Sequence, residues 1–199
     1  MNAAVFLDRD GVLNELVADP ASGLAESPLN VEDVRLIPGA AAAAARLQQA
    51  GYTLVCVTNQ PAAAKGKASV AQLHAVHARA LELLAEKGVT IAASRLCLHH
   101  ADGVVPELSK SCACRKPAPG MLLDTAAALD LDLSASWMVG DTDADVAAGS
   151  AAGCRTALIR TPGSVHKRFQ VMDEDLTADS LAAWVDMLGS RLTETITSG

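Results

Sequence analysis

The chain has 199 residues, of which 50% are hydrophobic and 20% charged, and its formal net charge is −7. This balance suits a globular α/β chain with a substantial core and argues against intrinsic disorder. The acidic excess argues against a nucleic-acid or anionic-membrane partner, because such partners require an extended basic surface.

The compartment is indicated by the N-terminal segment and the cysteines. Residues 3–7 are apolar and lead directly into charged residues, without the pattern of a secretory signal, and no apolar run is long enough to span a bilayer. We therefore expect a cytoplasmic protein, and we expect it to be a monomer. The 5 cysteines are expected to be thiols in a reducing compartment.

Strand and helix patterns alternate along the chain. Short apolar runs predict strands, and longer periodic segments that begin near proline or end at glycine predict helices. In chain order we expect a strand at 3–7, a helix at 39–50, a strand at 52–57, a helix at 70–87, a strand at 95–98, a helix at 117–129, a strand at 137–139, a helix at 143–152, a strand at 156–159 and a helix at 177–188.

This alternation predicts a Rossmann-like parallel sheet with helices on both faces. The continuous apolar character of the strands fits burial on both sides. Residues 1–199 contain no linker or internal repeat, so one domain is expected. The irregular segments 15–38 and 100–115 are too short to form a separate cap domain.

Polar residues follow several of the predicted strands. In open α/β sheets, ligands bind beyond the carboxyl ends of the strands. Asp8, Thr58 and Asp141 each follow a strand, and Lys116 stands just before a helix. These four segments are therefore expected to deliver their side chains to one crevice.

Two carboxylates, Asp8 and Asp10, stand two residues apart after the first strand. A carboxylate beside Mg²⁺ is a competent nucleophile toward phosphorus, and a second carboxylate can protonate the leaving oxygen and then activate water. Gly11 allows the chain to turn sharply after them. A simpler interpretation, in which Asp8 only caps an Asp-rich turn, stays open on these residues alone.

Four segments together resemble the motifs of the haloacid dehalogenase (HAD) superfamily of phosphohydrolases. They are Asp8-Arg9-Asp10-Gly11, Thr58, Lys116 within Cys114-Arg115-Lys116-Pro117, and Gly140-Asp141-Thr142-Asp143-Ala144-Asp145. They occur in the family's order and extend over the chain to about Arg160. The resemblance implies a HAD-like fold and a Mg²⁺-dependent phosphatase that forms an aspartyl-phosphate intermediate.

The resemblance also implies a role for each matching residue. Asp8 is the nucleophile and Asp10 the general acid and base. Thr58 hydrogen-bonds the phosphoryl group, and Lys116 neutralises its charge. The Mg²⁺ ligands are Asp8, Asp10 and Asp141. These residue types supply the positioning and charge neutralisation that phosphoryl transfer needs.

A cluster of cysteine and histidine lies between the second and third motifs. Cys97 and His99 are followed, after a loop, by Cys112 and Cys114, and three thiolates with one imidazole form a common tetrahedral zinc set. We expect a structural Zn²⁺ that fixes a loop leading into Lys116. Spacing does not distinguish His99 from His100, although the resemblance favours His99. The simpler alternative is a group of buried free cysteines.

The zinc loop narrows the resemblance to capless HAD phosphatases that act on heptose 1,7-bisphosphate or histidinol phosphate. In that subfamily, residues matching Asn59 and Arg115 also contact the substrate. The small-molecule substrate implied first is D-glycero-D-manno-heptose 1,7-bisphosphate; histidinol phosphate or another sugar phosphate is the alternative. The segment Pro61-Ala62-Ala63-Ala64-Lys65-Gly66 departs from the subfamily pattern, which bears on substrate choice.

Two non-enzymatic functions compete with this interpretation. A phospho-acceptor signalling domain also uses a strand-end aspartate, Mg²⁺, a threonine and a lysine, and a zinc-dependent interaction module would use the cysteine cluster alone. The combination of Asp8, Asp10 and Asp141 argues against both.

Several further residues have simple interpretations. Asp145 matches an acidic position of the fourth motif. The simpler alternative is that it serves only as a cap for the following helix. Lys65 and Lys67 could meet a second phosphate, and a solvated loop is the plainer interpretation. His74 and His77 stand at helical spacing, which suggests a surface face of the helix.

Overall fold

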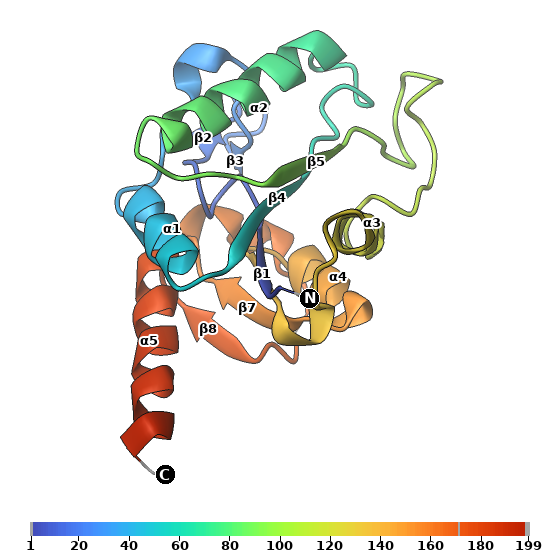
Figure 1. The fold of residues 1–199 in the computed structure, drawn as a ribbon. Coiled ribbons are helices and arrows are strands. Elements are labelled where there is room, and N and C mark those ends of the chain that lie inside the picture. Colours follow the sequence, from blue (N-terminus) through green and yellow to red (C-terminus); the bar gives the residue numbers. More distant parts are fainter. Residues whose placement is uncertain (1, 171, 198–199) are drawn as a thin grey trace.

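The computed structural model describes residues 2–170 and 172–197 and contains a six-stranded sheet (Figure 1). All neighbouring strands in this sheet are parallel, which confirms the predicted fold class. Their order is β5 (Ala93–Cys97), β4 (Thr53–Asn59), β1 (Ala4–Leu7), β6 (Trp137–Gly140), β7 (Arg155–Ile159) and β8 (Leu176–Ala178).

Strand β8 differs from the prediction, since the sequence pattern indicates a single helix at 177–188. Its three residues pair with β7, and the main-chain N–H of Arg160 donates to the carbonyl of Ala178 at 2.8 Å. The final helix, α5, begins only at Leu181 and extends to Thr197. An edge strand of this length shows too few residues for a period to be read, so pairing rather than local pattern decides its structure.

Helices cover both faces of the sheet, as predicted. Side chains of β1 alternate: Val5 and Leu7 join a core with α1 (Ala40–Gln49) and α5, and Phe6 joins a second core with α3 (Gly120–Leu129) and α4 (Asp143–Ala152). Helix α2 (Val70–Ala85) lies between β4 and β5 in the chain, and its C-terminal part reaches the first core.

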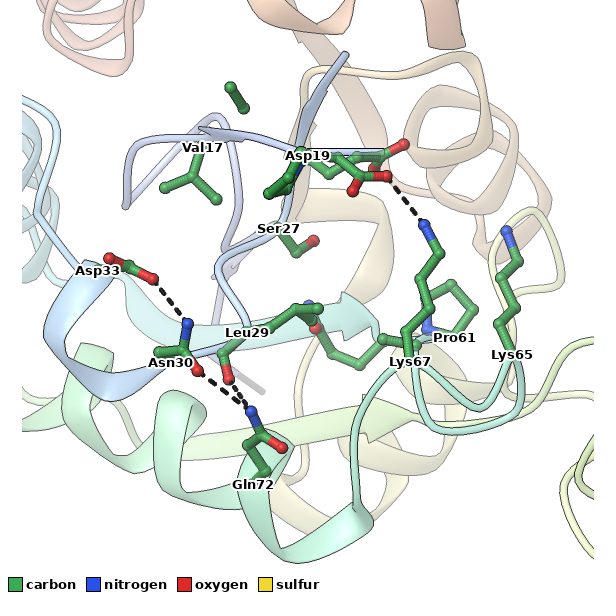
Figure 2. A pocket seen from close by; sticks show the side chains of 15 residues that line it. Val17, Asp19, Ser27, Leu29, Asn30, Asp33, Pro61, Lys65, Lys67 and Gln72 are labelled. Carbon is green, nitrogen blue, oxygen red and sulfur yellow. Dashed lines mark hydrogen bonds and ion pairs between the residues drawn. The ribbon is translucent and has the colours of Figure 1, made fainter. Parts of the chain in front are cut away.

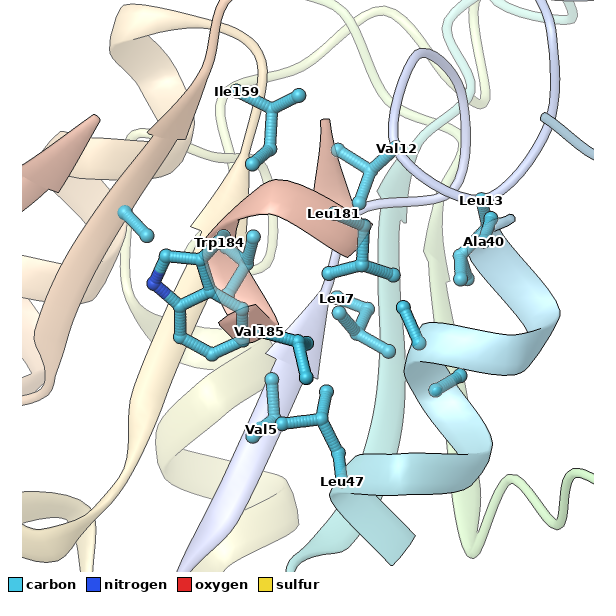
Figure 3. Packing of buried hydrophobic residues seen from close by; sticks show 14 of the residues in the cluster. Val5, Leu7, Val12, Leu13, Ala40, Leu47, Ile159, Leu181, Trp184 and Val185 are labelled. Carbon is cyan, nitrogen blue, oxygen red and sulfur yellow. The ribbon is translucent and has the colours of Figure 1, made fainter. Parts of the chain in front are cut away.

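The core under α5 compensates for the scarcity of aromatic residues with close packing of small side chains (Figure 3). Trp184 is fully buried and meets the ring of Trp137 edge to face, with 5.3 Å between the ring centroids. Aromatic pairs in this geometry add to the stability gained from burial. This packing fixes α5 against β1 and β6, the two strands that carry the site.

The chain order places a topological switch point between β1 and β6. From β1 the chain passes to β4 and β5 on one side, and later returns to β6 on the other side. The N–H of Asp8 donates to the carbonyl of Val139 at 2.9 Å, so the residues that follow β1 and β6 start side by side. Ligand sites in open α/β sheets form at such points.

Three short segments border this edge of the sheet. A small antiparallel hairpin consists of β2 (Val17–Ala18) and β3 (Ala25–Glu26), and a single turn, η1 (Val31–Asp33), follows it. A third segment, η3 (Pro162–Lys167), follows β7. Within the described part of the chain no insertion forms a separate cap domain. Among the helices of the described residues, none combines the length and apolar character needed to cross a membrane.

Candidate active site

Three buried carboxylates meet at the switch point. Asp8 follows β1, Asp141 follows β6, and Asp145 lies in the first turn of α4. One oxygen of each lies within 4.8 Å of the others, and all three residues are buried. The sequence predicted the meeting of Asp8 and Asp141, and the structure adds Asp145.

Among the described residues, one buried lysine, Lys116, contacts this group. Nζ of Lys116 lies 2.9 Å from Oδ1 of Asp8 and 2.6 Å from Oδ1 of Asp145, and it also donates to the carbonyl of Val57 at 2.8 Å. Burial lowers the pKa of Lys116, but the charges of Asp145 and Asp8 outweigh this effect and raise the pKa above its usual range. Lys116 is therefore charged and fixed between two carboxylates.

One lysine does not balance three carboxylates. Burial raises the pKa of Asp8 to about 6; Lys116 opposes this rise, and the charges of Asp145 and Asp10 add to it. Burial also raises the pKa of Asp141 well above its usual range, and the charges of Asp8 and Asp145 raise it further. Such crowded oxygen ligands fit a divalent cation, because a cation would relieve the repulsion that raises both pKa values.

Asp10 lies apart from this carboxylate group. Its oxygens accept hydrogen bonds from Nε and Nη2 of Arg9 at 3.0 and 2.9 Å, from Asn14 at 2.8 Å and from Gln60 at 2.6 Å. Burial raises the pKa of Asp10, but the Arg9 charge and these hydrogen bonds outweigh burial and hold the pKa below its usual value. The Asp10 carboxylate is therefore ionised at neutral pH.

The arrangement differs from the predicted set of magnesium ligands. The prediction combined the carboxylates of Asp8, Asp10 and Asp141, whereas the three that gather are those of Asp8, Asp141 and Asp145. The reason is the clamp of donors around Asp10, which directs its carboxylate toward Arg9. Participation of Asp10 in metal binding remains a prediction that this geometry does not favour.

Thr58 is buried near the carboxyl end of β4, and its hydroxyl accepts a hydrogen bond from the same Gln60 amide at 2.9 Å. Gln60 thereby joins Thr58 to Asp10. The sequence prediction included Thr58 but gave no role to Gln60, because a single amide just after a strand has no distinctive spacing.

Asn59 and Arg115 both support the segment before α3. The Asn59 amide pairs with the main chain of Lys116, donating to its carbonyl at 2.9 Å and accepting from its N–H at 3.1 Å. Nη1 of Arg115 donates to the carbonyl of His99 at 3.2 Å. Contacts of these two side chains with substrate stay a prediction. In the structure, both side chains hydrogen-bond with the main chain of the protein.

Asp145 has two structural partners at once. Its Oδ2 accepts from the N–H and hydroxyl of Thr142 at 3.0 and 2.6 Å, which caps the start of α4. Its Oδ1 faces Lys116. The capping role was expected, and it does not exclude a place in the site.

Sequence reasoning missed Ser164. This buried residue of η3 donates a hydrogen bond from its hydroxyl to Oδ2 of Asp141. Nearby, the Thr161 hydroxyl donates to the carbonyl of Gly11 at 2.6 Å. Gly11 has a φ of 84°, and a Cβ there would collide with the Asp141 carboxylate, so only glycine fits. No spacing in the sequence indicates the contact of Ser164, which depends on tertiary structure.

The predicted zinc ligands also come together. The Sγ atoms of Cys97, Cys112 and Cys114 lie 3.3 to 3.6 Å apart, and Nδ1 of His99 lies 3.8 Å from Cys97 and 3.5 Å from Cys114. The Nδ1 atom of His100 instead accepts from the N–H of Asp102. Zn–S bonds of about 2.3 Å place tetrahedral ligands at similar mutual separations, so this cluster could hold Zn²⁺.

A parallel sheet that gathers two strand-end aspartates, the helix-cap carboxylate of Asp145 and a buried lysine at its switch point fits a HAD-type phosphohydrolase. The comparisons agree: the HAD-hydrolase-like family model matches residues 113–184.

Two curated relatives and one solved structure cover most of the chain. The D-glycero-beta-D-manno-heptose-1,7-bisphosphate 7-phosphatase of Pseudomonas aeruginosa is 38% identical over 180 residues, covering 90% of this chain and 93% of the relative. The D-glycero-D-manno-heptose-1,7-bisphosphate 7-phosphatase of Thermosynechococcus vestitus is 38% identical over 95% of this chain and 96% of its own. The crystal structure of D,D-heptose 1,7-bisphosphate phosphatase from B. bronchiseptica, complexed with magnesium and phosphate, has a TM-score of 0.79 and 32% identity, over 95% of this chain and 99% of that chain.

The chain belongs to the heptose-1,7-bisphosphate 7-phosphatase family of HAD-like hydrolases. It is a phosphatase, as the sequence predicted.

Proposed function

We propose that the chain hydrolyses the 7-phosphate of D-glycero-D-manno-heptose 1,7-bisphosphate and that Asp8 is the nucleophile. The observation that carries this proposal is the buried Lys116, which contacts Asp8 next to Asp141 and Asp145 at the switch point. The relatives' names support the choice of sugar.

In the first half-reaction, an oxygen of Asp8 attacks the phosphorus. The bond from phosphorus to the sugar oxygen breaks, and an acyl phosphate forms on Asp8. Lys116 and the hydroxyl of Thr58 bind the phosphoryl oxygens, because an ammonium and a hydroxyl supply the charge and hydrogen bonds that the transferring group needs. Asp10 donates a proton to the departing sugar oxygen.

In the second half-reaction, Asp10 accepts a proton from water as that water attacks the phosphorus. Inorganic phosphate leaves and Asp8 is regenerated. The Arg9 clamp favours the ionised form of Asp10, which suits this half-reaction. For the first half-reaction Asp10 has to take up a proton before the sugar oxygen departs.

The carboxylates of Asp8, Asp141 and Asp145 would hold Mg²⁺, and their crowding supports this assignment. When bound, Mg²⁺ neutralises charge on the phosphoryl oxygens. Ser164 orients Asp141 through its hydroxyl, and Lys116 keeps Asp8 in place.

The residues Cys97, His99, Cys112 and Cys114 would hold a structural Zn²⁺ with all four positions filled by protein. Cys114 directly precedes Arg115 and Lys116 in the chain. The cluster would therefore fix the segment that carries the phosphate-binding lysine, without any part in the chemistry.

We further propose that the protein acts as a cytoplasmic monomer on a small phosphorylated molecule. Zinc thiolates require reduced cysteines, which supports a reducing compartment. Size-exclusion chromatography with light scattering measures the mass directly, and a dimer mass would contradict the monomer.

The experiment is a phosphate-release assay with wild-type protein and Asp8→Asn. The substrates are both anomers of heptose 1,7-bisphosphate, heptose 7-phosphate and histidinol phosphate. Wild type is expected to prefer a heptose bisphosphate, and folded Asp8→Asn to release no phosphate. A preference of the wild type for histidinol phosphate would contradict the proposed substrate and identify histidinol phosphate in its place. A stable phosphoprotein without turnover would indicate a signalling domain.

A further inference from the structure

A cavity of about 450 Å³ is bordered by the hairpin β2–β3 and by the loop that follows β4, and its volume is within the usual range of small-ligand sites (Figure 2). Gln60 and Ser27 are among its lining residues, and both hydrogen-bond with Asp10. Lys65 and Lys67 line it farther along the loop that follows β4. Because the charge of Asp10 acts on Asp8, the cavity lies on the Asp10 side of the site, toward which a substrate with its phosphate at Asp8 can extend.

The acidic side chains of the cavity already have partners. Asp19 pairs with Lys67 at 2.9 Å, Asp33 accepts from Asn30 at 3.0 Å, and Glu26 pairs with Lys167 at 2.7 Å. Each carboxylate is thereby neutralised or hydrogen-bonded.

Lys65 differs from its neighbours. Within residues 2–170 and 172–197 its ammonium has no ion pair and no hydrogen bond, whereas the ammonium of Lys67 is held by Asp19. Figure 2 shows both side chains extending in the same direction, with the dashed contact only at Lys67. Lys65 therefore offers an uncompensated positive charge in a chain whose net charge is −7.

The backbone that presents Lys65 is fixed. The carbonyl of Ala64 accepts from the N–H groups of Val104 and Val105 at 2.7 and 3.1 Å, both in the loop between the cysteine pairs. The N–H of Lys65 itself donates to the carbonyl of Pro61 at 3.0 Å. Only the side chain has to be ordered on binding, which reduces the entropic cost.

We propose that Lys65 binds the second phosphate of a sugar bisphosphate, the phosphate that is not hydrolysed. This inference rests on the proposed function and adds the residue that distinguishes a bisphosphate from a monophosphate. A compact ammonium suits a phosphate as a point charge.

The test compares Lys65→Ala with Lys110→Ala, which removes the same charge from an exposed lysine outside the cavity. The measured quantity is the ratio of kcat/KM for heptose 1,7-bisphosphate to kcat/KM for heptose 7-phosphate. Lys65→Ala removes a charged hydrogen bond to the second phosphate at a partly exposed site, so we expect this ratio to fall about tenfold. We expect no change in the ratio for Lys110→Ala. Added salt should lower the wild-type ratio but not that of Lys65→Ala.

An unchanged ratio in Lys65→Ala, or an equal loss on both substrates, would overturn the inference and leave the proposed function standing. Wild-type protein that hydrolyses neither heptose phosphate would instead overturn the proposed function, and the inference with it.

Discussion

The side-chain amide of Asn59 pairs with the main chain of Lys116 through two hydrogen bonds, of 2.9 and 3.1 Å. The amide at the end of β4 thus fixes both peptide groups of a residue 57 positions later in the chain. We infer that Asn59 acts by positioning Lys116.

Asn59→Asp should lower kcat/KM on a small activated phosphate ester by about tenfold to a hundredfold, the usual effect of displacing a catalytic group. The new carboxylate cannot donate to the Lys116 carbonyl and places a negative oxygen against it. Asn2→Asp, which makes the same charge change at an exposed residue, is the control. If Asn59 only contacts the sugar, the small ester will react normally and KM for the bisphosphate alone will rise.

Ser164→Ala should weaken Mg²⁺ binding several-fold, because Asp141 loses the hydroxyl that fixes its carboxylate and a hydrogen bond is worth about 1 kcal/mol. Isothermal titration with Mg²⁺ in the absence of substrate measures this directly. Thr161→Val is the matched control, since it removes the neighbouring hydroxyl, which contacts the Gly11 carbonyl and no carboxylate. Equal Mg²⁺ affinities in wild type and Ser164→Ala would show that Ser164 only fills space.

Cys112→Ser should lose zinc and catalytic rate on the sugar substrate while keeping Mg²⁺ affinity. The cluster fixes the segment before Lys116, whereas Asp8 and Asp141 are held by the sheet. Elemental analysis should find about one zinc per wild-type chain, as one four-ligand site requires. Slow hydrolysis of a small ester should survive in the mutant. Mg²⁺ binding that disappears together with zinc would mean that the cluster supports the whole fold.

Because His77 is buried, we predict that the protein is less stable in mild acid. Burial, together with the charge of Arg9, lowers the pKa of His77 from 6.5 to about 4, although Asp10 opposes the shift. Between these values the unfolded chain binds a proton that the folded chain does not. The contribution of His77 to the free energy of unfolding is therefore fully present above pH 6.5. It falls as the pH drops toward 4, by up to about 3 kcal/mol.

Urea unfolding at pH 7.5 and pH 5 measures this effect. The drop between the two pH values should be smaller in His77→Gln than in wild type, by about 2 kcal/mol. His74→Gln, on the exposed side of the same helix, should keep the wild-type drop. Identical drops in wild type and His77→Gln would refute the assignment.

Much of the fold could be predicted because long apolar runs and glycine-terminated helices carry their own signals. Helix α4 has the predicted bounds, 143–152, since Thr142 and Asp145 form a local cap. Strand β8 could not be predicted, because its structure comes from pairing with β7. His77 was expected at the surface, yet it is buried, and the charges of Arg9 and Asp10 act on it.

The candidate site also contains residues that the sequence predicted and residues that it did not. Asp8, Lys116 and Asp141 were predictable because each follows a strand or precedes a helix in a recognisable motif. The contacts of Ser164 and Gln60 were not predictable, because they join residues 23 and 50 positions apart without any shared spacing. Arg9 and Asn14 are close to Asp10 in the chain, but no sequence pattern shows that their side chains turn toward it. A sequence shows which residue types are present at strand ends, but not which way a carboxylate turns.

Asp145 caps α4 with one oxygen and holds Lys116 with the other. Folding and phosphate binding therefore share one side chain. In a lineage that no longer needed the phosphatase activity, loss of the Asp145 carboxylate would still remove the cap of α4 and destabilise this helix, which packs on β6. The residue would be retained for stability alone, so an aspartate at this position in a distant homologue is poor evidence that the homologue is still an enzyme.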